Sequence, residues 1–177
     1  LKEADRSQNR SLGSILRFLL LTGARRNEAL HAMWENFDFV AMIWTIPLSK
    51  SGKAHHVPIT AALYALLMSV PRVDGVAYVF PSKFGKPFAN IFNAWNTARK
   101  RAGLPNVRLH DLRHSFAVRS LEQCGGTRIE ISRQITALST YMGHAHVSDT
   151  YWYLQATPLL MAQISAAQEN CFLREVK

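Results

Sequence analysis

Cysteines, long apolar runs and acidic residues are all scarce in this sequence. The 177 residues include only two cysteines, Cys124 and Cys171, too few for a disulfide framework and not arranged as a metal-binding motif. No apolar run approaches the roughly 20 residues that cross a bilayer, and no signal peptide begins the chain. We therefore expect a cytoplasmic protein, in a reducing compartment, with no membrane anchor.

The shortage of acidic residues leaves a large positive charge. The chain has 21 lysines and arginines against 12 aspartates and glutamates, which gives a formal net charge of +9. The excess is concentrated between Lys83 and Arg133, where ten residues are basic and three are acidic. A basic field of this kind favours a polyanionic partner such as nucleic acid, the alternative being a basic protein without such a partner.

The length fits one domain, which we place at residues 1–177. Apolar residues make up 48% of the chain, an ordinary share for a folded protein, so extensive disorder is excluded. The sequence begins with Leu1 rather than Met. We therefore expect part of a longer protein, with an upstream domain absent.

Apolar residues recur at helical spacing over most of the chain, which predicts a largely helical protein. The predicted helices cover residues 11–23, 26–33, 60–70, 89–102, 108–123 and 132–142, with a last amphipathic helix that begins at Pro158.

Two alternating segments, 42–47 and 55–59, predict strands on either side of the polar turn 49–53. A third short strand is expected at 77–80. The other segments are expected to be irregular: a lead-in at 1–10, and connections at 34–39 and 81–87. The fold class is therefore mainly α with a small antiparallel β-sheet (α+β).

Residues 143–154 combine a helix end, a tight turn and a new helix start. Gly143 suits the left-handed position just after a helix, which glycine adopts without steric cost. Ser148 suits an N-cap, and Asp149 in the first turn suits the helix dipole. The turn therefore places His144 and Tyr153 on adjoining helix ends.

A set of basic and aromatic side chains in the sequence suits the chemistry of a phosphodiester. Its members are Arg25, Lys50, His110, Arg113, His144 and Tyr153. The set contains no carboxylate cluster, so it fits a hard metal ion poorly. Each residue also has a structural alternative: Arg25 can pair with Glu28, Lys50 can be a solvated charge, and Tyr153 can be core.

Each member of the set has a role that follows from the phosphate. Displacement at phosphorus builds negative charge, and Arg25 and Arg113 can bind the charged oxygens with their planar forks. Tyr153, whose hydroxyl has an ordinary pKa of about 10, needs these cations and a histidine base to act as a nucleophile. Lys50 can protonate the departing sugar oxygen.

Five motifs, in their order along the chain, resemble the tyrosine recombinase (phage integrase) family. They are Thr22-Gly23-Ala24-Arg25 with Glu28, Lys50 in a hairpin before Val57-Pro58, His110-Asp111-Leu112-Arg113-His114, Gly143-His144, and Tyr153 nine residues after His144. The resemblance covers residues 11–160. It implies the catalytic-domain fold of that family.

The resemblance also implies roles for these residues. It makes Arg25 and Arg113 the two phosphate-binding arginines. It makes His110 a proton-transfer and phosphate-contacting residue, His144 a hydrogen-bond donor to the phosphate, and Tyr153 the nucleophile that forms a 3′-phosphotyrosyl bond.

The general acid and the supporting residues follow from the same resemblance. Lys50 matches the hairpin lysine that protonates the 5′-hydroxyl, with Lys53 as the alternative. Glu28 and Asp111 match supporting residues, at helix starts or behind the phosphate ligands.

Two tyrosines near His144 compete for the role of nucleophile. Tyr151 and Tyr153 are two residues apart, which is about 200 degrees on a helix, so only one can enter the site. The spacing from His144 favours Tyr153.

The expected function is that of a site-specific DNA recombinase or integrase catalytic domain, with strand exchange through a Holliday junction. It acts on double-stranded DNA, requires neither ATP nor metal, and forms a tetramer on DNA through its C-terminal helix. The family's N-terminal DNA-clamping domain is absent from this sequence. We expect a bacterial, phage or mobile-element origin and association with the nucleoid; segment 125–133 has no assigned role.

Three alternative functions stay open at this point. One is a nicking and sealing enzyme of the type IB topoisomerase kind, and another is a catalytically silent DNA-binding protein on the same scaffold. The third is a metal protein that uses His110, His114, His144 and His146, although the arginines between them make a poor cation site.

Overall fold

The computed structural model describes residues 1–47, 54–122, 128–144 and 146–154. Its contacts group the chain into two compact units, residues 1–116 with 141–143, and residues 117–140 with 144 onward. The single domain over 1–177 stays a prediction. In the described ranges, no helix is both long and apolar enough to span a bilayer.

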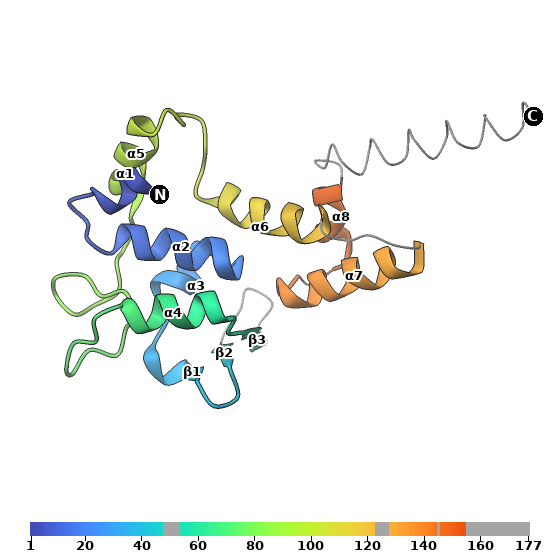
Figure 1. Ribbon diagram of the computed structural model, residues 1–177, viewed down its shortest axis with the longest axis horizontal. Helices are drawn as coiled ribbons and strands as arrows, with labels where there is room; N and C mark the ends of the chain where they lie inside the picture. Colours follow the sequence, from blue (N-terminus) through green and yellow to red (C-terminus); the bar gives the residue numbers. More distant parts are fainter. Residues whose placement is uncertain (48–53, 123–127, 145, 155–177) are drawn as a thin grey trace, which may run out of the picture. The chain divides into compact units, whose positions relative to one another are not determined.

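The first unit is mostly helical, with α2 packed against α1, α3 and α4 (Figure 1). Its helices are α1 (Lys2–Asp5), α2 (Leu12–Thr22), α3 (Arg26–Leu30), the 3-10 helix η1 (Trp34–Asn36), α4 (Ala61–Ser69), α5 (Phe92–Arg101) and the beginning of α6 (His110–Glu122). The helical segments predicted at 11–23, 60–70 and 108–123 are confirmed, whereas α3 ends three residues before the predicted 33 and α5 begins three residues later than predicted.

A three-stranded antiparallel sheet completes this unit. It consists of β1 (Phe37–Asp38), β2 (Ile43–Ile46) and β3 (His55–Pro58) in that order, with Trp44 opposite Val57 and Ile46 opposite His55. The strands predicted at 42–47 and 55–59 are confirmed, and the turn at 49–53 lies outside the described residues.

The predicted third strand at 77–80 is wrong. Tyr78 forms a single bridge with Met33, and the third strand is β1, within a segment predicted to be a connection. Residues 77–80 resemble a strand in sequence because they include the apolar residues Val79 and Phe80. These two side chains are fully buried in the core. They pack there without forming a ladder of strand hydrogen bonds.

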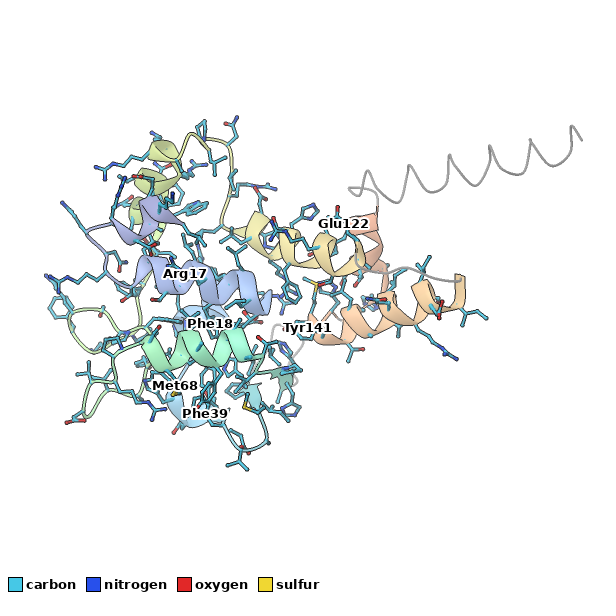
Figure 2. The ribbon with its side chains drawn as sticks, viewed as in Figure 1. Arg17, Phe18, Phe39, Met68, Glu122 and Tyr141 are labelled. Carbon is cyan, nitrogen blue, oxygen red and sulfur yellow. The ribbon has the colours of Figure 1, made fainter. Side chains whose placement is uncertain are left out.

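Aromatic side chains form the centre of the first unit. Phe18 on α2, labelled in Figure 2, meets the rings of Trp44, Phe80 and Phe37 edge-on, at centroid distances of 4.9, 5.4 and 6.3 Å. Phe37 also stacks on Trp44 at 5.5 Å. Edge-to-face pairs of this kind add to the free energy of burial. They fix α2 against the sheet and so fix the position where α2 ends.

The N-terminal residues are more ordered than the predicted lead-in. They form α1, in which Ala4 is buried, and the guanidinium group of Arg17 donates to both carboxylate oxygens of Asp5, at 2.7 Å for the Nη2–Oδ2 bond. These contacts connect residues twelve positions apart, which local sequence patterns do not reveal.

The second unit contains the rest of α6, most of α7 (Arg128–Tyr141) and α8 (Ser148–Leu154). Its buried side chains include Ala117, Leu121, Ile135, Leu138, Thr150 and Tyr153. The helix predicted at 132–142 begins earlier, at Arg128, so residues 128–133 of the unassigned segment are helical. The amphipathic helix predicted after Pro158 lies outside the described residues.

Candidate functional site

A cleft of about 830 Å³ lies in the first unit, between the start of α3, strand β2 and the start of α6. Three of the six predicted catalytic residues line it, Arg25, His110 and Arg113, together with the predicted supporting residue Glu28. A larger cavity of about 1220 Å³ lies in the same unit, beside α1 and α5, and none of the predicted site residues lines it. Because three predicted catalytic residues line the smaller cleft, that cleft is the candidate site.

The segment from Thr22 to Arg25 is shaped by a glycine. Gly23 has φ +61°, and a methyl group added there would lie 2.5 Å from the ring of Phe116, so only glycine fits. The Thr22 hydroxyl donates to the carbonyl of Phe18 at 2.7 Å and accepts from the amide of Ala24 at 3.2 Å. These bonds end α2 and direct the chain into α3.

Arg25 is held at the start of α3 by Glu28. The backbone amide of Arg25 donates to Oε2 of Glu28 at 2.7 Å, and Nη1 of Arg25 donates to Oε1 at 2.8 Å. The carboxylate thus closes the first helical turn and also orients the guanidinium group. A second contact runs from Nη2 of Arg25 to the carbonyl of Gly143, at 3.2 Å. The ion pair given above as the alternative is therefore present, and it leaves Arg25 on the wall of the cleft.

Arg113 is buried, with 4% of its surface exposed. Its Nη1 donates to the carbonyl of Gly23 and its Nη2 to the carbonyl of Met142, each at 2.6 Å. Hydrogen bonds from a charged donor are short and strong, and two of them fix the plane of the guanidinium group. Carbonyl oxygens are dipoles, so these bonds orient the positive charge without cancelling it.

His110 begins α6 and lines the same cleft. Its pKa is lowered by loss of hydration and then by Arg113 and Arg108, while Asp111 opposes the shift. At neutral pH the imidazole is therefore neutral and able to accept a proton.

Asp111 lies in the first turn of α6 and binds the residue that precedes the helix. Its carboxylate accepts from the amide of Arg108 at 2.8 Å and from the guanidinium group at 3.0 and 3.1 Å. Although burial acts to raise the pKa of Asp111, these hydrogen bonds lower it. Asp111 thus fixes the helix start that carries His110 and Arg113.

In the second unit, His144 and Tyr153 lie together. The amide of His144 donates to the carbonyl of Ser139 at 3.1 Å, and Nδ1 lies 2.8 Å from the hydroxyl of Thr150. The rings of His144 and Tyr153 are nearly parallel, with centroids 6.1 Å apart. Thr150 is fully buried and Tyr153 is 5% exposed. Since Thr150 and Tyr153 are three residues apart on α8, one face of this helix meets the histidine.

Tyr141 is a further tyrosine close to the site, but it is poorly suited to ionise. Its ring stacks on Phe116 at a centroid distance of 5.3 Å, and burial raises its pKa to about 12, with Arg113 opposing the shift. Lys50, Lys53 and the side chain of Tyr151 lie outside what the structure describes. Among the described residues, no three His, Cys, Asp or Glu side chains gather where they could hold a metal ion.

Sequence reasoning missed two features of this site. One is His55 on β3, which shares a strand face with buried Val57; the alternation of the strand could have revealed it. The other is the pair of carbonyl groups at residues 142–143 that accept from Arg113 and Arg25. No sequence signal marks a backbone oxygen as the partner of a distant side chain.

Comparison with known proteins places this site in a family. The model of the phage integrase family matches residues 1–159. The integrase of Haemophilus phage HP1 is 31% identical over 161 residues, which cover 89% of this chain and 41% of that protein. The chain spans about half the length of the curated relatives it matches, 51% and 56% for two of them.

Comparison with solved structures gives a consistent result. The catalytic domain of bacteriophage HP1 integrase matches with a TM-score of 0.63 and 28% identity, covering 93% of this chain and 86% of that domain. XerA recombinase matches with a TM-score of 0.69 over 94% of this chain and 59% of its own, and at 23% identity this likeness concerns the fold alone. The predicted fold class, including the tyrosine recombinase catalytic fold, is confirmed. With a family model that matches nearly its whole length, the chain belongs to the phage integrase family.

Proposed function

We propose that this chain is the catalytic domain of a site-specific DNA recombinase, which breaks and rejoins double-stranded DNA through a 3′-phosphotyrosyl bond to Tyr153. One observation carries the proposal: in a member of the integrase family, Arg25, His110 and Arg113 line a single cleft. Two fixed guanidinium groups beside a neutral imidazole suit a phosphodiester undergoing displacement.

The arginines supply the electrostatic part of the reaction. Negative charge grows on the non-bridging oxygens as the nucleophile approaches phosphorus, and donors already in place stabilise it without reorganisation. Arg113 is fixed by two carbonyl groups and Arg25 by Glu28 and one carbonyl group. Guanidinium groups stay protonated at any physiological pH, so these two residues can bear the charge themselves.

The covalent step then proceeds by in-line displacement. The Tyr153 oxygen bonds to phosphorus, its proton passes to neutral His110, and the bond between phosphorus and the 5′-oxygen breaks. Lys50 gives a proton to that oxygen, so a 5′-hydroxyl departs, and His144 donates to the phosphate. Attack by a 5′-hydroxyl from a second duplex reverses these steps and exchanges the strands. Because the phosphotyrosyl bond conserves the phosphodiester energy, no ATP is needed.

Two further observations support double-stranded DNA as the substrate. The formal net charge of +9 favours a polyanion. Proteins of the same fold at 20% identity or below, XerH recombinase and the Tn1549 transposon integrase, were solved in complex with DNA. We further propose assembly as a tetramer on DNA through the helix predicted after Pro158; a deletion from residue 158 that leaves assembly on DNA unchanged would contradict this.

The test uses a library of nicked duplexes. A library is needed because the target sequence is unknown. A nick next to the cleaved phosphate lets the short 5′-hydroxyl fragment diffuse away, which traps the covalent product. The chain is incubated with a library of such duplexes with a randomised central region, and the molecules that become attached to protein are recovered and sequenced. Peptide mapping then locates the attached residue.

We expect an enriched DNA sequence with protein attached at a 3′ end through Tyr153. Tyr153→Phe abolishes the adduct, whereas Tyr151→Phe, the matched control two residues away, retains it. An adduct that survives Tyr153→Phe, or that forms at a 5′ end, would overturn the proposal. Rejoining only of the original strands would favour a nicking and sealing enzyme.

A further inference from the structure

Two adjacent histidines on β3 have opposite surroundings. His56 is exposed, and its Nδ1 lies 3.1 Å from the hydroxyl of Thr45. His55 points to the other face of the strand, with Val57, and its Nδ1 is buried with no hydrogen-bond partner among the described residues. A buried polar atom without a partner is costly and rare in folded proteins. His55 has none of the roles predicted from the sequence.

The ring of His55 lies against the turn that both site arginines bind. A methyl group added to Gly143 would come within 3.3 Å of Nδ1 and within 3.5 and 3.6 Å of two ring carbons of His55. The Gly143 carbonyl accepts from Arg25, and the neighbouring Met142 carbonyl accepts from Arg113. The imidazole therefore supports the turn from the α-carbon side, while the arginines bind its oxygens.

Burial is the main reason why the ring of His55 stays neutral. Burial lowers its pKa most; Glu28 has the next largest effect and raises the pKa, whereas Arg25, Arg113 and His56 lower it. Arg25 and Glu28 belong to the start of α3, Arg113 to α6 and His56 to the same strand. A proton added to His55 would place another cation beside two guanidinium groups.

We propose that His55 is a positioning residue of the active site: as a neutral imidazole, it holds the 142–143 turn, and through that turn Arg25 and Arg113, in place to receive the scissile phosphate. The inference rests on the proposed function, since it assigns His55 to the same phosphate site. His55 acts through the arginines and does not itself touch the phosphate. Acid then inactivates the enzyme partly by protonating His55.

The test compares three variants with the unaltered chain. His55→Ala removes the ring, and His55→Asn keeps a planar polar group at the position of Nδ1 that cannot take a proton. His56→Asn is the matched control on the exposed face. Single-turnover attachment to the enriched nicked duplex is measured from pH 5 to pH 8.

We expect His55→Ala to slow attachment at pH 7.5 by about tenfold or more, as misplaced binding groups do. His55→Asn should stay within about threefold of the unaltered rate, and its acid limb should be less steep by about one proton. His56→Asn should follow the unaltered chain at every pH.

A second measurement does not depend on activity. In the folded chain, the pKa of His55 lies below the value of about 6.5 expected in the unfolded chain, so between the two values the unfolded state binds more protons. The contribution of His55 to stability is therefore complete above about pH 6.5 and is lost as the pH falls through the folded value. Thermal unfolding of His55→Asn should depend less on pH over this range than that of the unaltered chain or of His56→Asn.

The outcomes separate the two proposals. If the unaltered chain attaches to DNA through Tyr153 but His55→Ala reacts at the same rate, the inference on His55 is wrong and the proposed function stands. An unchanged acid limb and an unchanged pH dependence of unfolding in His55→Asn would also overturn it. If the unaltered chain forms no adduct with any duplex, the proposed function itself fails. Should His55→Ala not fold, His55→Asn decides the question.

Discussion

Among the described residues, the first unit of the chain holds its site residues beside a large apolar core, whereas the second holds His144 beside Tyr153 on α8. In the first unit, Arg113 is fixed by two backbone carbonyl groups, and Arg25 by the carboxylate of Glu28 and one carbonyl group. In the second, the contacts of His144 include the carbonyl of Ser139 on α7, and Thr150 and the ring of Tyr153 on α8.

Under the proposed function, the arginines that bind the charged oxygens belong to the first unit, where hydrogen bonds fix their guanidinium groups; a misplaced donor would lose its advantage in the transition state. The proposed nucleophile, Tyr153, belongs to the seven-residue helix α8 of the second unit. We expect substitution of the buried Arg113 in the first unit to affect stability and reaction together, and substitution of Thr150 in the second to affect mainly the reaction.

The largest effect is expected at Arg113. In Arg113→Lys, one ammonium group cannot reproduce two hydrogen bonds to the carbonyls of Gly23 and Met142. We expect a loss of about 3 kcal/mol in the free energy of unfolding and roughly a 10³-fold slower attachment to DNA. Urea unfolding and single-turnover kinetics measure the two effects. If Arg113→Lys proved as stable as the unaltered chain and reacted at the same rate, the expected contrast between the two units would be wrong.

Arg25 should separate the two effects. Its guanidinium group is more exposed and has Glu28 and one carbonyl as partners, so Arg25→Lys should cost less than about 1 kcal/mol in stability. Loss of the planar fork should slow attachment about 10²-fold. Arg101→Lys, at an exposed position at the end of α5 and outside this cleft, is the control and should change neither quantity. Equal effects at both positions would argue against Arg25 as a phosphate ligand.

Thr150 tests the second unit. Thr150→Val keeps the shape of the side chain and removes the hydroxyl 2.8 Å from Nδ1 of His144. We expect attachment about tenfold slower, because the imidazole loses the partner that sets its orientation, and a stability loss of about 1 kcal/mol. Thr140→Val, at an exposed position on α7, should leave the rate unchanged. A stability loss at Thr150 as large as that at Arg113 would contradict the proposed division.

The smallest effect is expected at the exposed ion pair between Asp5 and Arg17. A side-chain hydrogen bond from Arg17 lowers the pKa of Asp5 against the effect of burial, so the pair contributes above the ordinary carboxylate pKa and the contribution is lost as pH falls below it. Surface pairs contribute at most about 1 kcal/mol. Asp5→Asn should therefore lower the melting temperature slightly at pH 7, by an amount that shrinks as the pH falls through the lowered pKa of Asp5, and leave attachment to DNA untouched.

The sequence predicts those features that depend on neighbours along the chain. Helical periodicity gives α2, and the need for a left-handed residue after a helix gives the positive φ of Gly143. Strand alternation gives β2 and β3. Patterns of this kind depend on one element at a time, so they survive without knowledge of the packing.

Features that depend on distant segments could not be predicted in this way. Residues 77–80 look like a strand because Val79 and Phe80 are apolar. Only the assembled core shows that these side chains are buried by packing and not within a sheet. The carbonyl partners of Arg113 belong to residues 90 positions before it and 29 positions after it. His55 lies in a recognised strand, but its place beneath Gly143 depends on a turn far along the chain.

The two hydrogen bonds of Arg113 also have a consequence for how the protein acquires its activity. Each closes a chain loop, of 90 and of 29 residues, and closing loops of this length carries an entropic cost that local helices do not. The guanidinium group reaches its working orientation only when the end of α2, the start of α6 and the end of α7 have come together. Under the proposed function, a nascent or partly folded chain can therefore carry the same basic residues and attract DNA, yet it lacks the fixed charge geometry that cleavage would need.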